Sequence, residues 1–221
     1  MNPTKIEWTD RTWNPVTGCN NACVYCYARK MANRLKGRFG YPKNEPFTPT
    51  FHPDRLSEPL NIKKPSKIFV CSMSDLFGKW VPDTWIQQVL DVVRRAPHHT
   101  FQFLTKNPVR YADFEFPNNA WIGYSTEGPL FHCWDTKHKD NVKFVSIEPM
   151  SEPLQIKLDG YYQAINFNLL IVGKETGNRR QRITPKNEWI EQIIDFTEKT
   201  NIKLFLKNNL NYESTIQEFP I

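Results

Sequence analysis

Six short β-prone runs divide the chain of 221 residues, and their spacing restricts the fold more than any other feature. They lie at 67–72, 100–105, 121–125, 143–147, 169–173 and 203–207. Several are apolar at both odd and even positions, which is typical of parallel strands covered on both faces. Because helical patterns lie between the runs, the sequence predicts an α/β fold with a parallel sheet.

The intervening segments predict three helices. Asp83 is expected to cap one that ends before Pro97, with an apolar stripe of Ile86, Val89, Leu90 and Val93. Thr184 and Pro185 are expected to start another, with a stripe of Trp189, Ile190, Ile193 and Ile194. A third is expected from about 27 to 36. Six or seven such units, in one domain spanning 1–221, favour a partial (β/α)6-7 TIM-like barrel with parallel strands over an open sheet.

Polar side chains follow every predicted strand. In a barrel such residues converge on one mouth, where active sites lie. They are Ser72, Ser74 and Asp75; Thr105 and Lys106; Ser125 and Glu127; Ser146 and Glu148; Lys174 and Glu175; Lys207 and Asn208. The barrel interpretation therefore predicts that these side chains meet.

Three of the five cysteines, Cys19, Cys23 and Cys26, fall within one loop at 18–27. An odd count with clustered spacing does not suit a disulfide framework. Three local thiolates can instead hold a [4Fe–4S] cluster and leave one iron without a protein ligand, open to a cofactor.

Two other interpretations of the cysteines stay open. Structural zinc needs four ligands, and His132 or His52 could complete a three-cysteine site. A thioredoxin-type pair of Cys23 and Cys26 would leave Cys19 without a role. The spacing favours the cluster over both.

The C-x3-C-x2-C spacing, with an aromatic residue before the last cysteine, resembles the signature of the radical S-adenosylmethionine superfamily. More closely, the chain resembles the phage-type Gp37/Gp68 family, which is related to spore photoproduct lyase. The matching stretches are 13–19, 26–28, 72–77, 104–106, 146–149 and 171–173. Two features differ: many members separate their first two cysteines more widely, and the glycine pair near the sixth strand reads Gly173-Lys174 here.

The resemblance implies a radical enzyme of lyase or transferase type that binds a [4Fe–4S] cluster and S-adenosyl-L-methionine. Cys19, Cys23 and Cys26 would hold the cluster, whose electron converts the cofactor into a 5′-deoxyadenosyl radical that takes hydrogen from a substrate. Tyr25 would lie against the adenine, or simply pack the loop. The further expected cofactor contacts are Ser72, Ser74, Asp75, Lys106, Ser125, Glu127, Glu148 and Lys174.

Capping, turn and surface roles are open alternatives for the serines and lysines among these residues. Asp75 suits an ammonium group by charge-assisted hydrogen bonding. Outside the cluster, Cys133 is expected to act catalytically by returning a hydrogen atom, a role implied by the relation to spore photoproduct lyase. Cys71 is expected to be a buried strand residue.

Charge is distributed unevenly along the chain. Residues 1–111 contain 17 Lys and Arg side chains against 8 Asp and Glu, whereas 112–221 contain 12 against 15. A basic half can bind a phosphate backbone or can simply be a solvated surface. No apolar window is long enough for a membrane span, and the first residues do not resemble a secretory signal. We therefore expect a cytoplasmic protein with no membrane partner.

These features leave several functions open. The first is a radical enzyme acting on a nucleobase, nucleotide or nucleic acid, reduced by a protein such as flavodoxin or ferredoxin. The second is a radical enzyme with a small-molecule or peptide substrate. The third is a non-catalytic zinc-binding interaction module.

Overall fold

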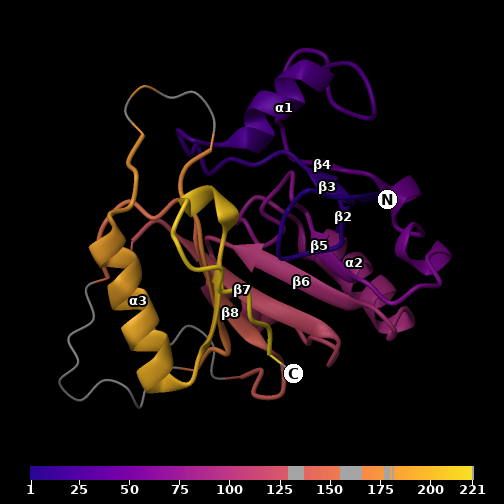
Figure 1. The fold of residues 1–221 in the computed structure, drawn as a ribbon. Coiled ribbons are helices and arrows are strands. Elements are labelled where there is room, and N and C mark those ends of the chain that lie inside the picture. The colour runs from indigo at the N-terminus through magenta and orange to yellow at the C-terminus, as the bar shows by residue number, and fades with distance from the viewer. Residues whose placement is uncertain (129–136, 155–165, 177–179, 181, 221) are drawn as a thin grey trace.

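A computed structural model describes residues 1–128, 137–154, 166–176, 180 and 182–220. Seven parallel strands form one sheet in the order in which they occur along the chain (Figure 1). They are β2 (Arg11–Trp13), β5 (Lys67–Val70), β6 (Thr100–Thr105), β7 (Ala120–Thr126), β8 (Lys143–Ile147), β9 (Leu169–Val172) and β10 (Lys203–Leu206). A short β1 (Asn2–Pro3) adds antiparallel to β2 at one edge. The predicted parallel α/β fold is confirmed.

All six predicted strands are present, and each end lies within two residues of its predicted position. The first parallel strand, β2, was not predicted, because its three residues contain no apolar run. Two further short strands, β3 (Val16–Thr17) and β4 (Thr50–Phe51), form a separate antiparallel pair beside the cysteine loop.

The three expected helices are also present, as α1 (Tyr27–Leu35), α2 (Asp83–Arg95) and α3 (Asn187–Thr200). The expected capping role of Asp83 is wrong. Pro82 occupies the N-cap position and Asp83 is the first helical residue. Likewise, α3 begins after Lys186 rather than at Thr184. Short 3₁₀ helices occur at η1 (Pro53–Arg55), η2 (Pro59–Asn61), η3 (Pro108–Asp113) and η5 (Asn208–Leu210).

Successive strand residues pack on opposite faces of the sheet. On one face, α2 covers the first four parallel strands and α3 covers the last three. On the other face, Trp8 contacts both Phe69 of β5 and Phe144 of β8, with ring centroids 4.7 and 6.0 Å away. Strands three places apart thus contact one side chain, so the sheet curves around Trp8.

The sheet does not close into a barrel, since β1 and β10 are its edges in the described part of the chain. The predicted partial barrel is therefore confirmed only as a parallel α/β sheet. Residues near both termini lie at the β10 edge: Ile216–Glu218 runs antiparallel to β10, and the Glu7 carboxylate accepts a hydrogen bond from the Asn208 backbone at 2.8 Å. Each described helix is too short or too polar to cross a lipid bilayer.

Candidate functional site

The cysteine loop is fixed to the rest of the protein by its backbone. Gly18 has a φ of +85°, and a Cβ at this position would lie 2.2 Å from the carbonyl oxygen of Thr48. Its N–H donates to the Met73 carbonyl at 2.9 Å, and the Cys19 N–H donates to the Phe47 carbonyl at 3.1 Å. Only glycine combines this conformation with so close an approach, so Gly18 determines where the loop begins.

Apart from a side-chain hydrogen bond between Cys23 and Tyr25, the three thiols form hydrogen bonds only with nearby backbone. Cys19 Sγ accepts the Asn21 N–H at 3.4 Å, and Cys26, at the N-cap of α1, accepts the Arg29 N–H at 3.3 Å. The Cys23 thiol lies 3.8 Å from the Asn21 carbonyl oxygen. Burial raises the pKa of the Cys19 thiol to about 11, so without a bound group it is protonated at neutral pH.

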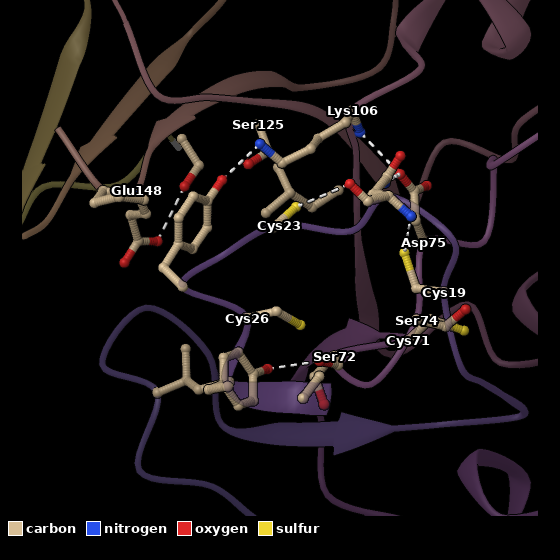
Figure 2. Close-up of a pocket in the computed structure, with 18 of the residues that line it drawn as sticks. Cys19, Cys23, Cys26, Cys71, Ser72, Ser74, Asp75, Lys106, Ser125 and Glu148 are labelled. Carbon is tan, nitrogen blue, oxygen red and sulfur yellow. Dashed lines mark hydrogen bonds between the residues drawn. The ribbon is translucent and has the colours of Figure 1, made fainter. Parts of the chain in front are cut away.

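All three cysteines line one cavity of about 250 Å³, and Figure 2 shows them approaching it from different sides. The carboxyl ends of the parallel strands form the opposite wall. Over the described ranges, no three His, Cys, Asp or Glu side chains form a group that could hold a metal ion. The thiols therefore share a cavity without converging on a single point.

Asp75 links this loop to the strand ends. Its carboxylate is buried and accepts from the Asn21 side chain at 2.9 Å, from the Thr105 hydroxyl at 2.6 Å, and from the backbone N–H of Lys106 and Phe77 at 3.0 and 3.2 Å. These four bonds use all of its strong acceptor positions. Asp75 therefore acts here as a positioning residue, and its contact with an amino group stays a prediction.

The serines beside Asp75 are also engaged. Ser74 donates to the Gly18 carbonyl at 2.7 Å, and Ser72 donates to the Asn14 side chain at 3.2 Å. The segment after β5 and the cysteine loop thus form one hydrogen-bonded unit.

Tyr25, Lys106 and Glu127 form a triangle across the cavity mouth. The Tyr25 hydroxyl donates to the Glu127 carboxylate at 2.5 Å, and Lys106 Nζ lies 2.7 Å from that hydroxyl and 2.9 Å from the carboxylate. Burial, followed by the hydrogen bond to Glu127, raises the pKa of Tyr25, so this hydroxyl stays protonated. The triangle connects the loop to the ends of β6 and β7.

A second charged pair lies at the other end of the strand-end wall. Lys207, after β10, forms an ion pair with Glu148, after β8, and the Ser146 hydroxyl donates to Glu148 at 3.0 Å. Gly173 leaves room for the pair, because a Cβ there would lie 2.9 Å from atoms of both side chains. Both charged groups are partly shielded, at 17% and 21% exposure.

The structure brings together nearly all of the site residues predicted from the sequence. The cavity is lined by Cys19, Cys23, Cys26, Tyr25, Ser72, Ser74, Asp75, Lys106, Ser125, Glu148 and Lys174. Glu127 reaches it through Tyr25 and Lys106. Cys133, the predicted catalytic residue, and His132 lie outside the described residues, and the roles of all these residues stay predictions.

Asn21, Tyr27 and Cys71 also line the cavity, although the sequence did not assign them to the site. Asn21 bonds Asp75, and the Tyr27 hydroxyl donates to the Ser72 carbonyl at 2.6 Å while burial raises its pKa to about 12. Cys71 is buried as expected, but it follows β5 and has a φ of +60°. Asn21 and Tyr27 could have been found from their places inside and directly after the cysteine motif.

The chain matches a family model described as "Protein of unknown function (DUF5131)" over residues 3–218. It belongs to the DUF5131 family. The match includes the cysteine loop and every strand end that lines the cavity. No curated protein and no solved structure matches the chain. The cavity itself is therefore the basis for inferring what this DUF5131 protein does.

Proposed function

We propose that this DUF5131 protein is a radical S-adenosylmethionine enzyme that carries a [4Fe–4S] cluster and acts on a nucleobase, nucleotide or nucleic acid. The observation that carries the proposal is the placement of three free cysteines of one loop on the wall of one cavity, opposite the strand ends. Seven parallel strands in chain order, curved around Trp8, suit the incomplete β/α barrel expected for such an enzyme.

The donor set fits the proposed cluster. A single metal ion needs its ligands to converge on one point, whereas a cubane cluster binds each thiolate through a different iron. Three thiols that line one cavity are one ligand short of a structural zinc site, but they are the number that leaves one iron of a cubane open. Backbone N–H groups already point at Cys19 and Cys26 sulfurs, and such hydrogen bonds stabilise thiolate character.

When bound, the cluster would supply the electron that splits S-adenosylmethionine into methionine and a 5′-deoxyadenosyl radical. The protein's own residues orient the reactants and exclude water. Asp75 holds the loop against the strand ends, and Tyr25 would contact the adenine from the loop side. Ser125, Glu148 and Lys174 face the cavity from neighbouring strand ends and would contact the ribose, the carboxylate or the substrate.

The Glu148–Lys207 pair would have to exchange partners when a ligand binds. Lys207 could then bind a carboxylate or phosphate, and Glu148 could accept hydrogen bonds from a hydroxyl or an ammonium group. In this proposal the enzyme works in the cytoplasm and receives electrons from a protein such as flavodoxin or ferredoxin. A small-molecule or peptide substrate is the second candidate, favoured by the modest cavity of about 250 Å³.

The proposal is tested on protein purified without oxygen. We expect a brown chromophore near about 400 nm, from charge transfer in a thiolate-bound cluster, with about four irons per chain. Incubation with dithionite and S-adenosylmethionine should give 5′-deoxyadenosine. Alanine at Cys19, Cys23 or Cys26 should abolish both signals.

Cys71→Ala is the matched control, because Cys71 lies in the same cavity but outside the loop. It should keep the chromophore and the product. Colourless protein with one tightly bound zinc per chain would contradict the proposal and favour the interaction module. For Cys133, normal turnover by Cys133→Ala without side products would contradict its proposed hydrogen-donor role.

A further inference from the structure

A strongly basic surface lies beside the cysteine loop, on α1 and the turn that follows it. We call it the basic face; its charged members are the exposed residues Lys30, Arg34, Lys36, Arg38 and Lys43. The chain contains no Asp or Glu between Asp10 and Glu45. Among the described residues, none of these five cations forms an ion pair. The basic face is therefore an uncompensated positive surface, and Figure 1 shows α1 standing clear of α2 and α3.

Exposed apolar side chains are concentrated in the same stretch of chain, from 24 to 39. Six large apolar residues are exposed in the described part of the chain, and four of them, Val24, Tyr27, Met31 and Phe39, lie here. Phe39 is the most exposed, at 72%. Scattered exposed apolar residues need no explanation, but their concentration in one segment rich in unpaired cations is typical of a binding surface.

The backbone around Phe39 holds its ring out in solvent. Phe39 has a φ of +52° and Gly40 one of +77°, and an aromatic residue rarely adopts the left-handed conformation. Arg55 donates to the Phe39 carbonyl at 2.5 Å and to the Asn14 carbonyl at 2.9 Å, which ties the turn to the body of the protein. Strain that the surrounding structure maintains often marks a functional position.

We propose that the basic face binds single-stranded nucleic acid, with a base stacked on Phe39 and phosphates on the surrounding Lys and Arg side chains. Cations that release counterions from phosphates, combined with an exposed aromatic ring, are the chemistry by which proteins hold single strands. This deepens the proposed function by making the substrate a polynucleotide. Tyr27 belongs to both the basic face and the cavity wall, so a bound strand would lie at the cavity mouth.

An acidic electron-transfer protein is the competing occupant. Such a partner must approach the thiols closely, but Arg34, Lys36 and Arg38 lie at the end of α1 opposite Cys26. The nine residues of α1 separate the two ends by roughly 13 Å at 1.5 Å per residue. The stacking ring lies at that distant end too, which favours a strand over an electron donor.

The test is the binding of a fluorescein-labelled single-stranded oligonucleotide of mixed sequence to the full chain, followed by anisotropy over a range of salt concentrations. Phe39→Ala should bind about tenfold more weakly with little change in the salt dependence. Phe39→Trp should bind at least as tightly as wild type, whereas Phe39→Leu, apolar but without a π face, should be as weak as Phe39→Ala. Lys36→Ala with Arg38→Ala should lower the slope of log K against log salt by about 0.7 for each lost phosphate contact.

Lys63→Ala with Lys64→Ala is the matched control, because these exposed lysines lie outside the basic face. It should leave binding unchanged. Wild-type strength in Phe39→Leu, or no binding by the wild type at low salt, would overturn the proposal. The proposal would also be overturned if the variant with Lys36→Ala and Arg38→Ala lost ferredoxin binding but bound the oligonucleotide as tightly as wild type.

The cysteine variants separate this inference from the proposed function. A variant with alanine at Cys19, Cys23 and Cys26 should bind the oligonucleotide normally, since the basic face does not include the thiols. Normal binding by a wild-type protein that forms no 5′-deoxyadenosine would support the inference and contradict only the radical chemistry.

Discussion

The two walls of the cavity are built in different ways. On the loop wall, the thiols bond only to residues two or three positions away, whereas the long-range contacts come from the backbone and from the Asn21 and Tyr25 side chains. On the strand-end wall, the side chains themselves bond across the sheet, as in the Lys106–Glu127 and Lys207–Glu148 pairs. The loop wall therefore presents thiols that the fold does not need, whereas the strand-end wall uses its functional groups to hold itself together.

This difference separates sites of stability from sites of chemistry. A backbone position on the loop wall should be costly to change, but a thiol should not. On the strand-end wall, the charged side chains themselves should be costly. Four substitutions test this contrast through the free energy of unfolding of the metal-free protein.

Gly18→Ala should cause the largest loss. The new methyl group would overlap the Thr48 carbonyl, and the positive φ adds strain, so we expect about 3 kcal/mol or more of destabilisation. Gly37→Ala is the control, since it has a φ of +71° but no atom within 3.8 Å of the added Cβ. It should cost only about 1 kcal/mol in urea denaturation. Equal losses would show that the close approach at Gly18 is unimportant.

Asp75→Asn should come next, at about 2–3 kcal/mol, because an amide cannot accept all four hydrogen bonds and leaves a buried donor facing another. The control is Asp91→Asn, an exposed residue whose ion pair with Arg94 contributes little. The same denaturation experiment measures both. If Asp75→Asn destabilised the protein no more than Asp91→Asn, the hydrogen bonds of Asp75 would not be what holds the loop in place.

Acidification should loosen the loop wall by a smaller amount. His52 is buried and bonds Thr17 of β3 at 2.8 Å, and burial lowers its pKa below the usual value of about 6.5. The unfolded chain then binds the proton more readily, so stability is complete above about pH 6.5 and is lost as the pH falls below it.

The wild type should lose free energy of unfolding between pH 7.5 and pH 5.5, as measured by denaturation at each pH. In His52→Gln this loss should be smaller. Part of it should remain, because burial also lowers the pKa of His99, far from the cysteine loop. If the free energy of unfolding of His52→Gln depended on pH as strongly as that of the wild type, groups other than His52 would cause the effect.

Cys23→Ala should have the smallest effect on folding, within about 0.5 kcal/mol, because its thiol makes only local contacts, with the Asn21 carbonyl and the Tyr25 side chain. The same substitution should remove the proposed cluster completely. Destabilisation comparable to Asp75→Asn would erase the distinction between the two walls.

The sequence predicted the strands better than the contacts between their ends. Apolar runs such as 143–147 identify strands because burial on both faces leaves a direct pattern. β2 was missed because its burial comes from Trp13 alone, within three residues. Parallel topology was enough to predict that the strand-end residues converge. It could not predict that the Asp75 carboxylate accepts four hydrogen bonds, because the four donors come from three separate segments.

The C-terminal segment along β10 has a consequence for how the protein behaves in solution. Leu206 donates to the Ile216 carbonyl at 2.7 Å, and the Glu218 N–H donates to Leu204 at 2.9 Å, so this segment occupies the hydrogen-bonding groups of an otherwise open edge. An unprotected edge strand can pair with another molecule and seed aggregation. Residues 216–218 therefore protect β10 from pairing with another molecule. An affinity tag should be placed where it does not disrupt the hydrogen bonds between this segment and β10.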